Sequence, residues 1–254
     1  MISPYKINIT LFIVSLAGLF LVVVTGINKS LFISVNSFAA TTNPFIWANL
    51  TFLGDTLPAC TFMLLFIRKR PDLVWSGIIA TILALIIVNS LKYFTGVMRP
   101  PAVIDKGSIN IIGPALMRRA FPSGHTVTIF TLTGIFMFHF RSAFVKTGMI
   151  FLALLVGISR IAVGVHWPAD VLAGAVFGSL FATTGVYVVT RLGWKRNRII
   201  QIILGLVLIL VVIYVLCFYD CGYSQAIYLQ YLLAFVILSA GLREYYLLLK
   251  PERN

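Results

Sequence analysis

The 254-residue chain has few charged residues and very few acidic ones. Asp, Glu, Lys and Arg together make up 11% of it, whereas a soluble domain carries about a quarter. Hydrophobic residues make up 60%, and the mean hydropathy is +1.00. These values exclude an ordinary soluble domain and predict an all-α, polytopic membrane helix bundle surrounded by the lipid bilayer.

The shortage of acidic residues leaves a formal charge of +13, which could suggest a nucleic-acid partner. The 20 Lys and Arg residues are scattered between apolar stretches, however, and we expect no nucleic acid to bind. Cysteine is scarce too: Cys60, Cys217 and Cys221 are an odd number, which argues against a disulfide framework. Because Cys, His and carboxylate residues show no metal-site spacing, we expect neither a metal nor another cofactor.

Long apolar stretches are abundant. Eight come close to the roughly 20 residues that cross a bilayer. Gly54, Asp55 and Pro58 interrupt the second, so its membrane helix could begin nearer Leu57 after an interfacial piece. Residues 30–44 are polar enough to lie along the membrane surface. The expected spans are residues 8–26, 45–67, 72–92, 124–140, 146–163, 168–190, 199–219 and 226–248.

The distribution of cations predicts the orientation. The first apolar stretch is too long for a typical signal peptide, and we expect it to be a retained span. With the N-terminus in the cytoplasm, most of the 20 cations fall in cytoplasmic segments, in keeping with the positive-inside rule. We therefore expect a multi-pass protein of the cell (inner) membrane with both termini cytoplasmic.

Three polar segments lie at the ends of expected spans, all on the outer, periplasmic or exterior side. They read LKYFTGVMRP (residues 91–100), FPSGH (121–125) and SRIAVGVHWPAD (159–170). Ionisable side chains at a membrane are costly and usually functional. Two of the three histidines fall in these segments, and His139, at the cytoplasmic end of its span, is expected to be structural.

In the first segment, Lys92 and Arg99 are two helical turns apart, so they share a face if the helix persists that far. Pro100 and Pro101 then end the helix. Two cations at a helix end suit an oxyanion. The alternative is that both side chains only reach up to lipid headgroups, as cations at span ends often do.

In the second segment, Ser123 is a candidate N-cap, and Gly124 would let a ligand approach the backbone closely. The free N–H groups and positive dipole end of the following helix would bind a phosphate. His125 could protonate a leaving oxygen, because histidine titrates near neutral pH. The alternative is a capped helix start beside an interfacial histidine.

In the third segment, the planar guanidinium of Arg160 could bind two phosphate oxygens. Pro168 suits the first turn of a helix, which places His166 just ahead of that turn and Asp170 within it. Asp170 could orient one ring nitrogen of His166 and leave the other free to attack phosphorus. The alternative is a helix-start aspartate favoured by the dipole, beside a histidine with a structural role.

Together these segments resemble the signature of the type 2 phosphatidic acid phosphatase superfamily, which shares its core with vanadium haloperoxidases and glucose-6-phosphatase. The signature KxxxxxxRP, PSGH and SRxxxxxHxxxD is matched in order and without departure, and the resemblance covers about residues 45–190. It implies a six-helix lipid phosphatase core in residues 1–198. Residues 199–254 would then add two transmembrane helices of unknown role.

The resemblance also implies the chemistry. His166 would attack phosphorus to give a phosphohistidine, while His125 would protonate the leaving group and then activate water. Asp170 would orient His166. The residues implied to hold the phosphoryl oxygens are Lys92, Arg99, Ser123, Gly124 and Arg160.

The expected substrate is a membrane lipid phosphate: undecaprenyl diphosphate, lipid A 1-phosphate, phosphatidylglycerol phosphate or phosphatidic acid. Arg118 and Arg119, in the outer loop, could reach a second phosphate or simply face an anionic membrane surface. Two other functions stay open. One is a lipid phosphotransferase that passes the phosphoryl group to another lipid; the other is a non-catalytic lipid transporter, which the rim position of the ionisable residues disfavours.

Overall fold

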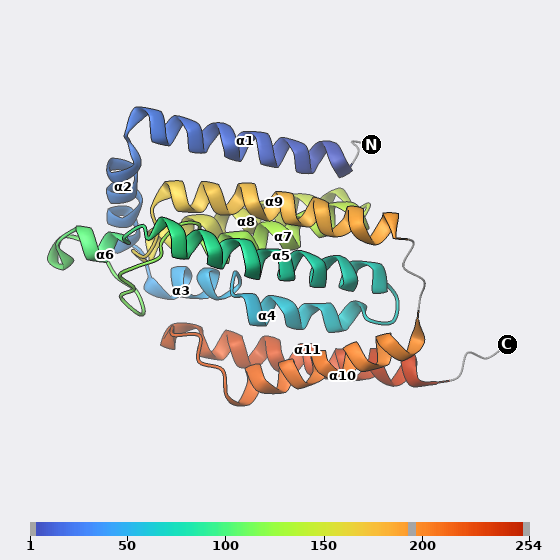
Figure 1. The fold of residues 1–254 in the computed structure, drawn as a ribbon. Coiled ribbons are helices and arrows are strands. Elements are labelled where there is room, and N and C mark those ends of the chain that lie inside the picture. The colour runs from blue at the N-terminus through green and yellow to red at the C-terminus, as the bar shows by residue number, and fades with distance from the viewer. Residues whose placement is uncertain (1–3, 193–196, 251–254) are drawn as a thin grey trace.

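The computed structural model describes residues 4–192 and 197–250, and every regular element in these ranges is a helix (Figure 1). The predicted all-α membrane bundle is confirmed. Six helices in these ranges are long and apolar enough to cross a bilayer, and each matches an expected span. They are α1 (Pro4–Thr25), α5 (Pro71–Thr95), α8 (Ala143–Ala162), α9 (Pro168–Arg191), α10 (Arg198–Cys217) and α11 (Ile227–Leu249).

A further span is bent, at the place where the sequence pattern is interrupted. Helix α3 (Pro44–Phe52) meets α4 (Thr56–Thr61) and its 3-10 extension η1 (Phe62–Phe66) at 52°. A Cβ atom on Gly54, in the bend, would lie 2.5 Å from Cγ1 of Val156 and 3.1 Å from the carbonyl oxygen of His125. The missing side chain therefore lets the bend pack directly against α8 and the helix that begins at Gly124.

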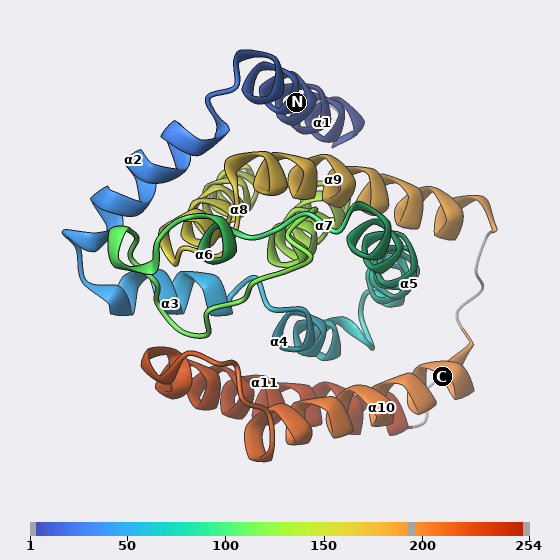
Figure 2. The ribbon, with the colours of Figure 1, turned by 60° about the vertical axis from the view of Figure 1, so that its left-hand side comes forward.

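That helix, α7 (Gly124–His139), is the centre of the bundle, enclosed by α5, α8 and α9 (Figure 2). At two glycines of α9, the backbone of α9 comes close to backbone carbonyl groups at the beginning of α7. A Cβ on Gly174 would lie 2.8 Å from the carbonyl oxygen of Ser123, and one on Gly178 would lie 2.7 Å from that of Val127. Small residues allow such close approach between membrane helices. The contact aligns the beginning of α7 with the beginning of α9, and so aligns two of the polar segments.

Helix α2 (Asn28–Ala40) runs across one end of the bundle, as expected for a surface-lying segment (Figure 1). Its buried Asn36 donates through Nδ2 to the carbonyl oxygens of Asn110 (2.8 Å) and Ala162 (3.0 Å), and its Oδ1 accepts the Asn110 N–H at 2.8 Å. Asn36 thereby fastens the outer loop to the end of α8. The loop's short helices are α6 (Pro100–Val103) and η2 (Lys106–Ser108).

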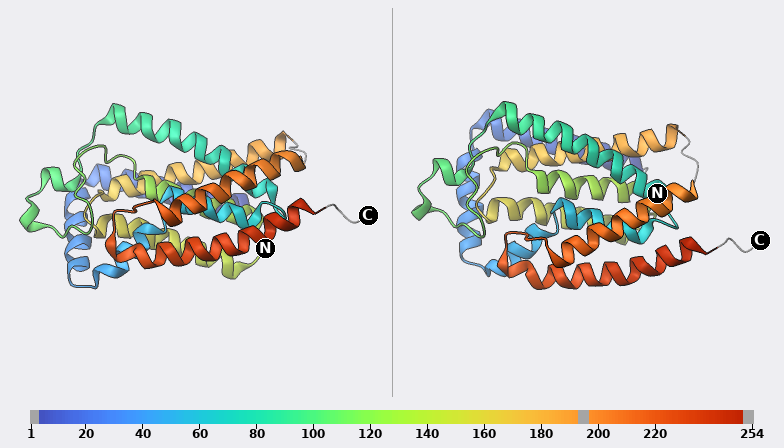
Figure 3. Two further views of the ribbon diagram at one scale, coloured as in Figure 1. Left: turned by 90° about the horizontal axis from the view of Figure 1, so that it is seen from below. Right: turned by 60° about the horizontal axis from the view of Figure 1, so that its bottom comes forward.

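Helices α10 and α11 form an antiparallel pair, connected through η3 (Ser224–Ala226), along the side of the bundle (Figure 3). They pack against the bent span, where Gly241 of α11 faces Leu64 of η1. The beginning of α1 and the end of α11 lie at the same end of the bundle, opposite α2 and α6 (Figure 1). This arrangement agrees with the expectation that both termini lie on one side of the membrane.

Candidate active site

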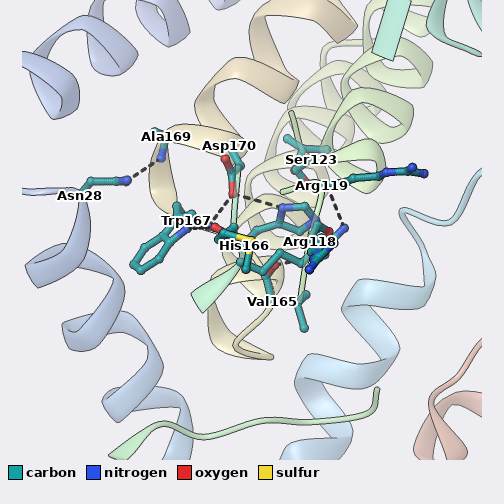
Figure 4. Close-up of polar contacts among 12 residues, drawn as sticks. Asn28, Arg118, Arg119, Ser123, Val165, His166, Trp167, Ala169 and Asp170 are labelled. Atoms are coloured by element: carbon teal, nitrogen blue, oxygen red, sulfur yellow. Dashed lines mark hydrogen bonds and ion pairs between the residues drawn. The ribbon is translucent and has the colours of Figure 1, made fainter. Parts of the chain in front are cut away.

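The three polar segments meet at the end of the bundle that carries α2 and α6. Nη1 of Arg99 lies 3.1 Å from Nε2 of His166, and the N–H of Ser123 donates to the carbonyl oxygen of Asp170 at 3.0 Å. Figure 4 shows Ser123, His166 and Asp170 grouped at the beginning of α9. Segments up to 78 residues apart in the chain, from Lys92 to Asp170, thus form one site.

Lys92 and Arg99 reach this site by different routes. Helix α5 ends at Thr95, and Gly96 follows in the left-handed region with φ 56°. Glycine adopts this conformation at little cost, and the chain turns away from the helix axis there. The helix therefore does not persist as far as Arg99, and the condition for Lys92 and Arg99 to share a helical face is not met. Lys92 extends from the last turn of α5, with its Nζ 3.5 Å from where a Cβ on Gly124 would stand.

Backbone carbonyl groups fix the Arg99 guanidinium, which is only 6% exposed. Its Nε donates to Arg118 at 2.9 Å, its Nη2 to Arg119 at 3.3 Å and its Nη1 to Val165 at 3.1 Å. Carbonyl oxygens orient a guanidinium without a formal neutralising charge. Arg99 therefore keeps its positive charge available for an anion.

His166 lies in the loop before α9, with Asp170 in the first turn, as expected. Nδ1 of His166 lies 3.3 Å from Oδ2 of Asp170, which also accepts the N–H of Trp167 at 2.8 Å. Because a guanidinium only donates hydrogen bonds, Nε2 carries the lone pair facing Arg99 and the Nδ1 proton faces Asp170. Burial, together with the charges of Arg99 and Arg160, lowers the pKa of His166 well below its ordinary value. The ring is therefore neutral at pH 7, with its Nε2 lone pair facing the Arg99 guanidinium.

The beginning of α7 is arranged differently from a capped helix. Ser123 occupies the N-cap position, but its side chain makes no capping bond; its Oγ instead accepts the hydroxyl hydrogen of Thr126 at 2.9 Å. Ser123 is therefore the N-cap residue by position, as expected, but its side chain does not cap the helix. The first N–H groups of α7, from Gly124 and His125 onward, thus lack a side-chain acceptor and can receive an anion.

Arg160 completes the set of cations from the last turn of α8. It is 2% exposed, and its Nη1 donates to the phenol oxygen of Tyr223 at 3.0 Å. Tyr223 was not among the residues expected from the sequence, because it lies in the α10–α11 connection, far along the chain from the polar segments. No local sequence signal distinguishes it from the other tyrosines of that helix pair.

The side chains of Arg118 and Arg119 are exposed at the entrance of the site. Both line a surface hollow with Asn89, Lys92, Tyr93 and Arg99. Their carbonyl groups hold Arg99, so these two residues contribute backbone to the site as well as charge to its mouth.

An apolar cavity of about 290 Å³ opens beneath Lys92 and Gly124. It lies between α4, α5 and α7 and descends into the bundle. Its lining is mostly hydrophobic and includes Ala59, Met63, Ile78, Val88, Leu132 and Leu208. The cavity therefore borders the polar site at Lys92 and Gly124.

His139 lies at the opposite end of α7. Its Nδ1 is 2.8 Å from the carbonyl oxygen of Ile135, and its Nε2 is 3.3 Å from Oδ2 of Asp72. These contacts agree with the structural role expected for it. Within the described ranges, no group of three or more His, Cys, Asp and Glu residues could hold a metal ion.

The chain is similar to known proteins in sequence and in fold. The family model of the PAP2 superfamily matches residues 73–198. The lipid A 1-phosphatase of Rhizobium etli is 34% identical over 125 residues, which is 47% of this chain and 48% of that protein. The undecaprenyl-diphosphatase of Sulfolobus acidocaldarius is 28% identical over 132 residues, which is 52% of this chain and 62% of that protein. The chain thus spans about half the length of the Rhizobium relative.

Among solved structures, that of Aquifex aeolicus LpxE superposes with a TM-score of 0.56 and 28% identity, over 63% of this chain and 95% of that one. The segment matched by the family model contains all three polar segments, which the fold gathers into one site. With its motifs, its fold and its relatives in agreement, this membrane-spanning chain belongs to the PAP2 superfamily, the type 2 phosphatidic acid phosphatases.

Proposed function

We propose that this protein is a lipid phosphatase that hydrolyses the phosphomonoester or pyrophosphate of a membrane lipid through a phosphohistidine. One observation carries the proposal. His166 is a buried, neutral imidazole whose Nδ1 faces Asp170 and whose Nε2 faces the fixed guanidinium of Arg99. This is the arrangement of an oriented nucleophile beside a group that binds the atom under attack.

In the first step, Nε2 of His166 attacks phosphorus, an N–P bond forms, and the P–O bond to the leaving alkoxide or phosphate breaks. A protonated His125 donates its proton to the departing oxygen and becomes neutral. In the second step, His125 takes a proton from water as the water attacks the phosphohistidine. The N–P bond breaks, inorganic phosphate leaves, and both histidines return to their initial states.

Fixed positive groups stabilise the charge that builds up on the phosphoryl oxygens. Lys92, Arg99 and Arg160 supply full charges, and the backbone at Ser123 and Gly124 supplies the positive end of α7. Positioning and electrostatics of this kind account for most of the catalysis in phosphoryl transfer. No metal takes part in the proposed steps.

The apolar cavity favours a lipid as the substrate. A phosphate held at Lys92 and Gly124 would leave the attached chain at the mouth of a hydrophobic space inside the bundle. The names of the Rhizobium etli and Sulfolobus acidocaldarius relatives support lipid A 1-phosphate and undecaprenyl diphosphate as candidates. Phosphatidylglycerol phosphate and phosphatidic acid complete the class to be tested.

We place the site on the periplasmic or exterior side of the cell (inner) membrane, because the opposite end carries most of the cations. Residues 1–198 would be the phosphatase core and residues 199–254 an added helix pair. In the proposed arrangement, a lipid enters from the bilayer with its headgroup at the level of α2 and α6.

The test is phosphate release by the purified protein in detergent micelles, with EDTA, from each of the four lipids and from glycerol phosphate. We expect turnover of at least one lipid and none by His166→Ala. Equal release by His166→Ala would overturn the covalent mechanism. The same test is run with a substrate whose phosphoryl group is radiolabelled. Transfer of that labelled phosphoryl group to a second lipid, without phosphate release, would instead establish a phosphotransferase.

A further inference from the structure

Tyr223 connects the C-terminal helix pair to the phosphate site. Its phenol oxygen accepts a hydrogen bond from Nη1 of Arg160 at 3.0 Å, and both side chains are buried, at 5% and 2% exposure. Tyr223 lies outside residues 73–198, which the family model matches. We propose that Tyr223 is a positioning residue that holds the Arg160 guanidinium in the direction from which it binds a phosphoryl oxygen. The inference rests on the proposed function.

The chemistry of the contact suits this role. Nε of Arg160 has no hydrogen-bond partner among the described residues, so the buried guanidinium keeps donors free. A carboxylate beside it would form an ion pair and would compete with the substrate for the positive charge. A phenol oxygen occupies one of the five N–H donors and leaves the charge unneutralised. Tyr223 thus orients Arg160 and keeps it able to bind an anion.

The outer loop fixes the ring of Tyr223 from the other side. Gly113 has φ +79°, and a Cβ at this position would lie 2.5 Å from Cε1 of the ring. The ring also belongs to a buried apolar cluster with Ile112, Val163 and Ala226. Close packing of this kind holds a side chain in one position. The phenol oxygen therefore has a defined place before any substrate arrives.

The rest of the α10–α11 connection is tied to the same end of the bundle. The phenol of Tyr219 donates to the carboxylate of Asp55, at the bend between α3 and α4. Nε2 of Gln230 donates to the carbonyl oxygen of Tyr219 at 2.7 Å, and Nδ2 of Asn49 donates to that of Gln225 at 3.3 Å. These bonds hold the α10–α11 connection against the bent span, and so keep Tyr223 close to Arg160.

The experiment removes the hydroxyl group and keeps the ring. Tyr223→Phe should weaken binding of orthovanadate, a tetrahedral phosphate analogue, and lower kcat/KM by about tenfold or more, the scale of a hydrogen bond to a charged group. Tyr228→Phe is the matched control, since that side chain is 79% exposed on the same helix pair. It should bind vanadate and turn over substrate as the wild type does. The thermal unfolding midpoint is measured for both variants.

A double-mutant cycle with Arg160→Lys separates positioning from simple packing. If Tyr223 acts through Arg160, adding Tyr223→Phe to Arg160→Lys should cost little further vanadate affinity. Fully additive losses, or a Tyr223→Phe protein with wild-type vanadate affinity and turnover, would overturn the inference. A wild-type protein that neither binds vanadate nor releases phosphate would instead refute the proposed function, and this outcome is visible before any variant is made.

Discussion

The carbonyl oxygen of Asp170 accepts the N–H of Ser123 at 3.0 Å, which joins the first turn of α9 to the N-cap position of α7. The carboxylate of the same Asp170 faces Nδ1 of His166. One residue therefore sets the position of the proposed nucleophile relative to the helix end that would receive the phosphate.

The first prediction separates the two histidines of the site. With 32P-labelled lipid diphosphate, His166→Ala should form no phosphoenzyme and should lose turnover by at least about a thousandfold, as expected for removal of a covalent nucleophile. His125→Ala should still accumulate phosphoenzyme, because the lipid monophosphate that leaves needs little help from an acid, but should release phosphate slowly. His139→Gln is the control at the far end of α7 and should keep its activity. Labelling of His166→Ala would contradict the mechanism.

The second prediction concerns Asp170→Asn. The substitution preserves size, but an amide cannot hold the His166 ring in the required tautomer as a carboxylate does. We expect kcat to fall by about 100-fold or more, by analogy with the same change in a Ser-His-Asp triad. The measurement is the rate of phosphoenzyme formation in a single turnover. A variant with an unchanged rate would show that Asp170 serves only as a helix-start residue.

The third prediction concerns Arg99→Lys, which keeps the charge. An ammonium group cannot reproduce the three directed bonds to the carbonyl groups of Arg118, Arg119 and Val165. We expect kcat/KM to fall by about 100-fold, the scale of losing one oxyanion-binding group. Lys69→Arg, at the opposite end of the bundle, is the control. Wild-type kcat/KM in Arg99→Lys would mean that charge alone suffices at this position.

The fourth prediction concerns substrate choice. If the exposed Arg118 and Arg119 side chains bind a second phosphate, alanine at either position should lower kcat/KM for a lipid diphosphate more than for a lipid monophosphate. Alanine keeps the backbone carbonyl groups of residues 118 and 119, which accept hydrogen bonds from Arg99. The measured quantity is the ratio of the two kcat/KM values. An unchanged ratio would assign these side chains to general attraction of an anionic membrane surface.

The fifth prediction concerns metal ions. Because Lys92, Arg99 and Arg160 supply the charge that a divalent ion would otherwise provide, phosphate release should continue in excess EDTA. Turnover is compared before and after dialysis against the chelator, with and without added Mg²⁺ or Zn²⁺. An enzyme inactivated by EDTA and restored by one ion would refute the metal-independent mechanism.

The sequence by itself determined six of the expected spans, and it pointed to the polar residues that the fold brings together. Apolar stretches of the length of a bilayer leave the backbone few alternatives to helix, because only helix satisfies its N–H and C=O groups in lipid. The bend of the second span was also predictable, from Gly54, Asp55 and Pro58. The i, i+4 spacing of His166 and Asp170 at a helix start predicted their contact, since both residues belong to one local structure.

Only the tertiary structure decided how distant segments meet. The left-handed Gly96 separates Arg99 from the helix of Lys92, and a neighbouring hydroxyl takes the Ser123 oxygen that was expected to cap α7. Tyr223 reaches Arg160 across 63 residues of chain. Such contacts depend on which helices pack together and at what depth, and local sequence carries little information about either. The identity of the expected site residues was therefore local, whereas their orientation, and the contact of Tyr223 with Arg160, came from packing.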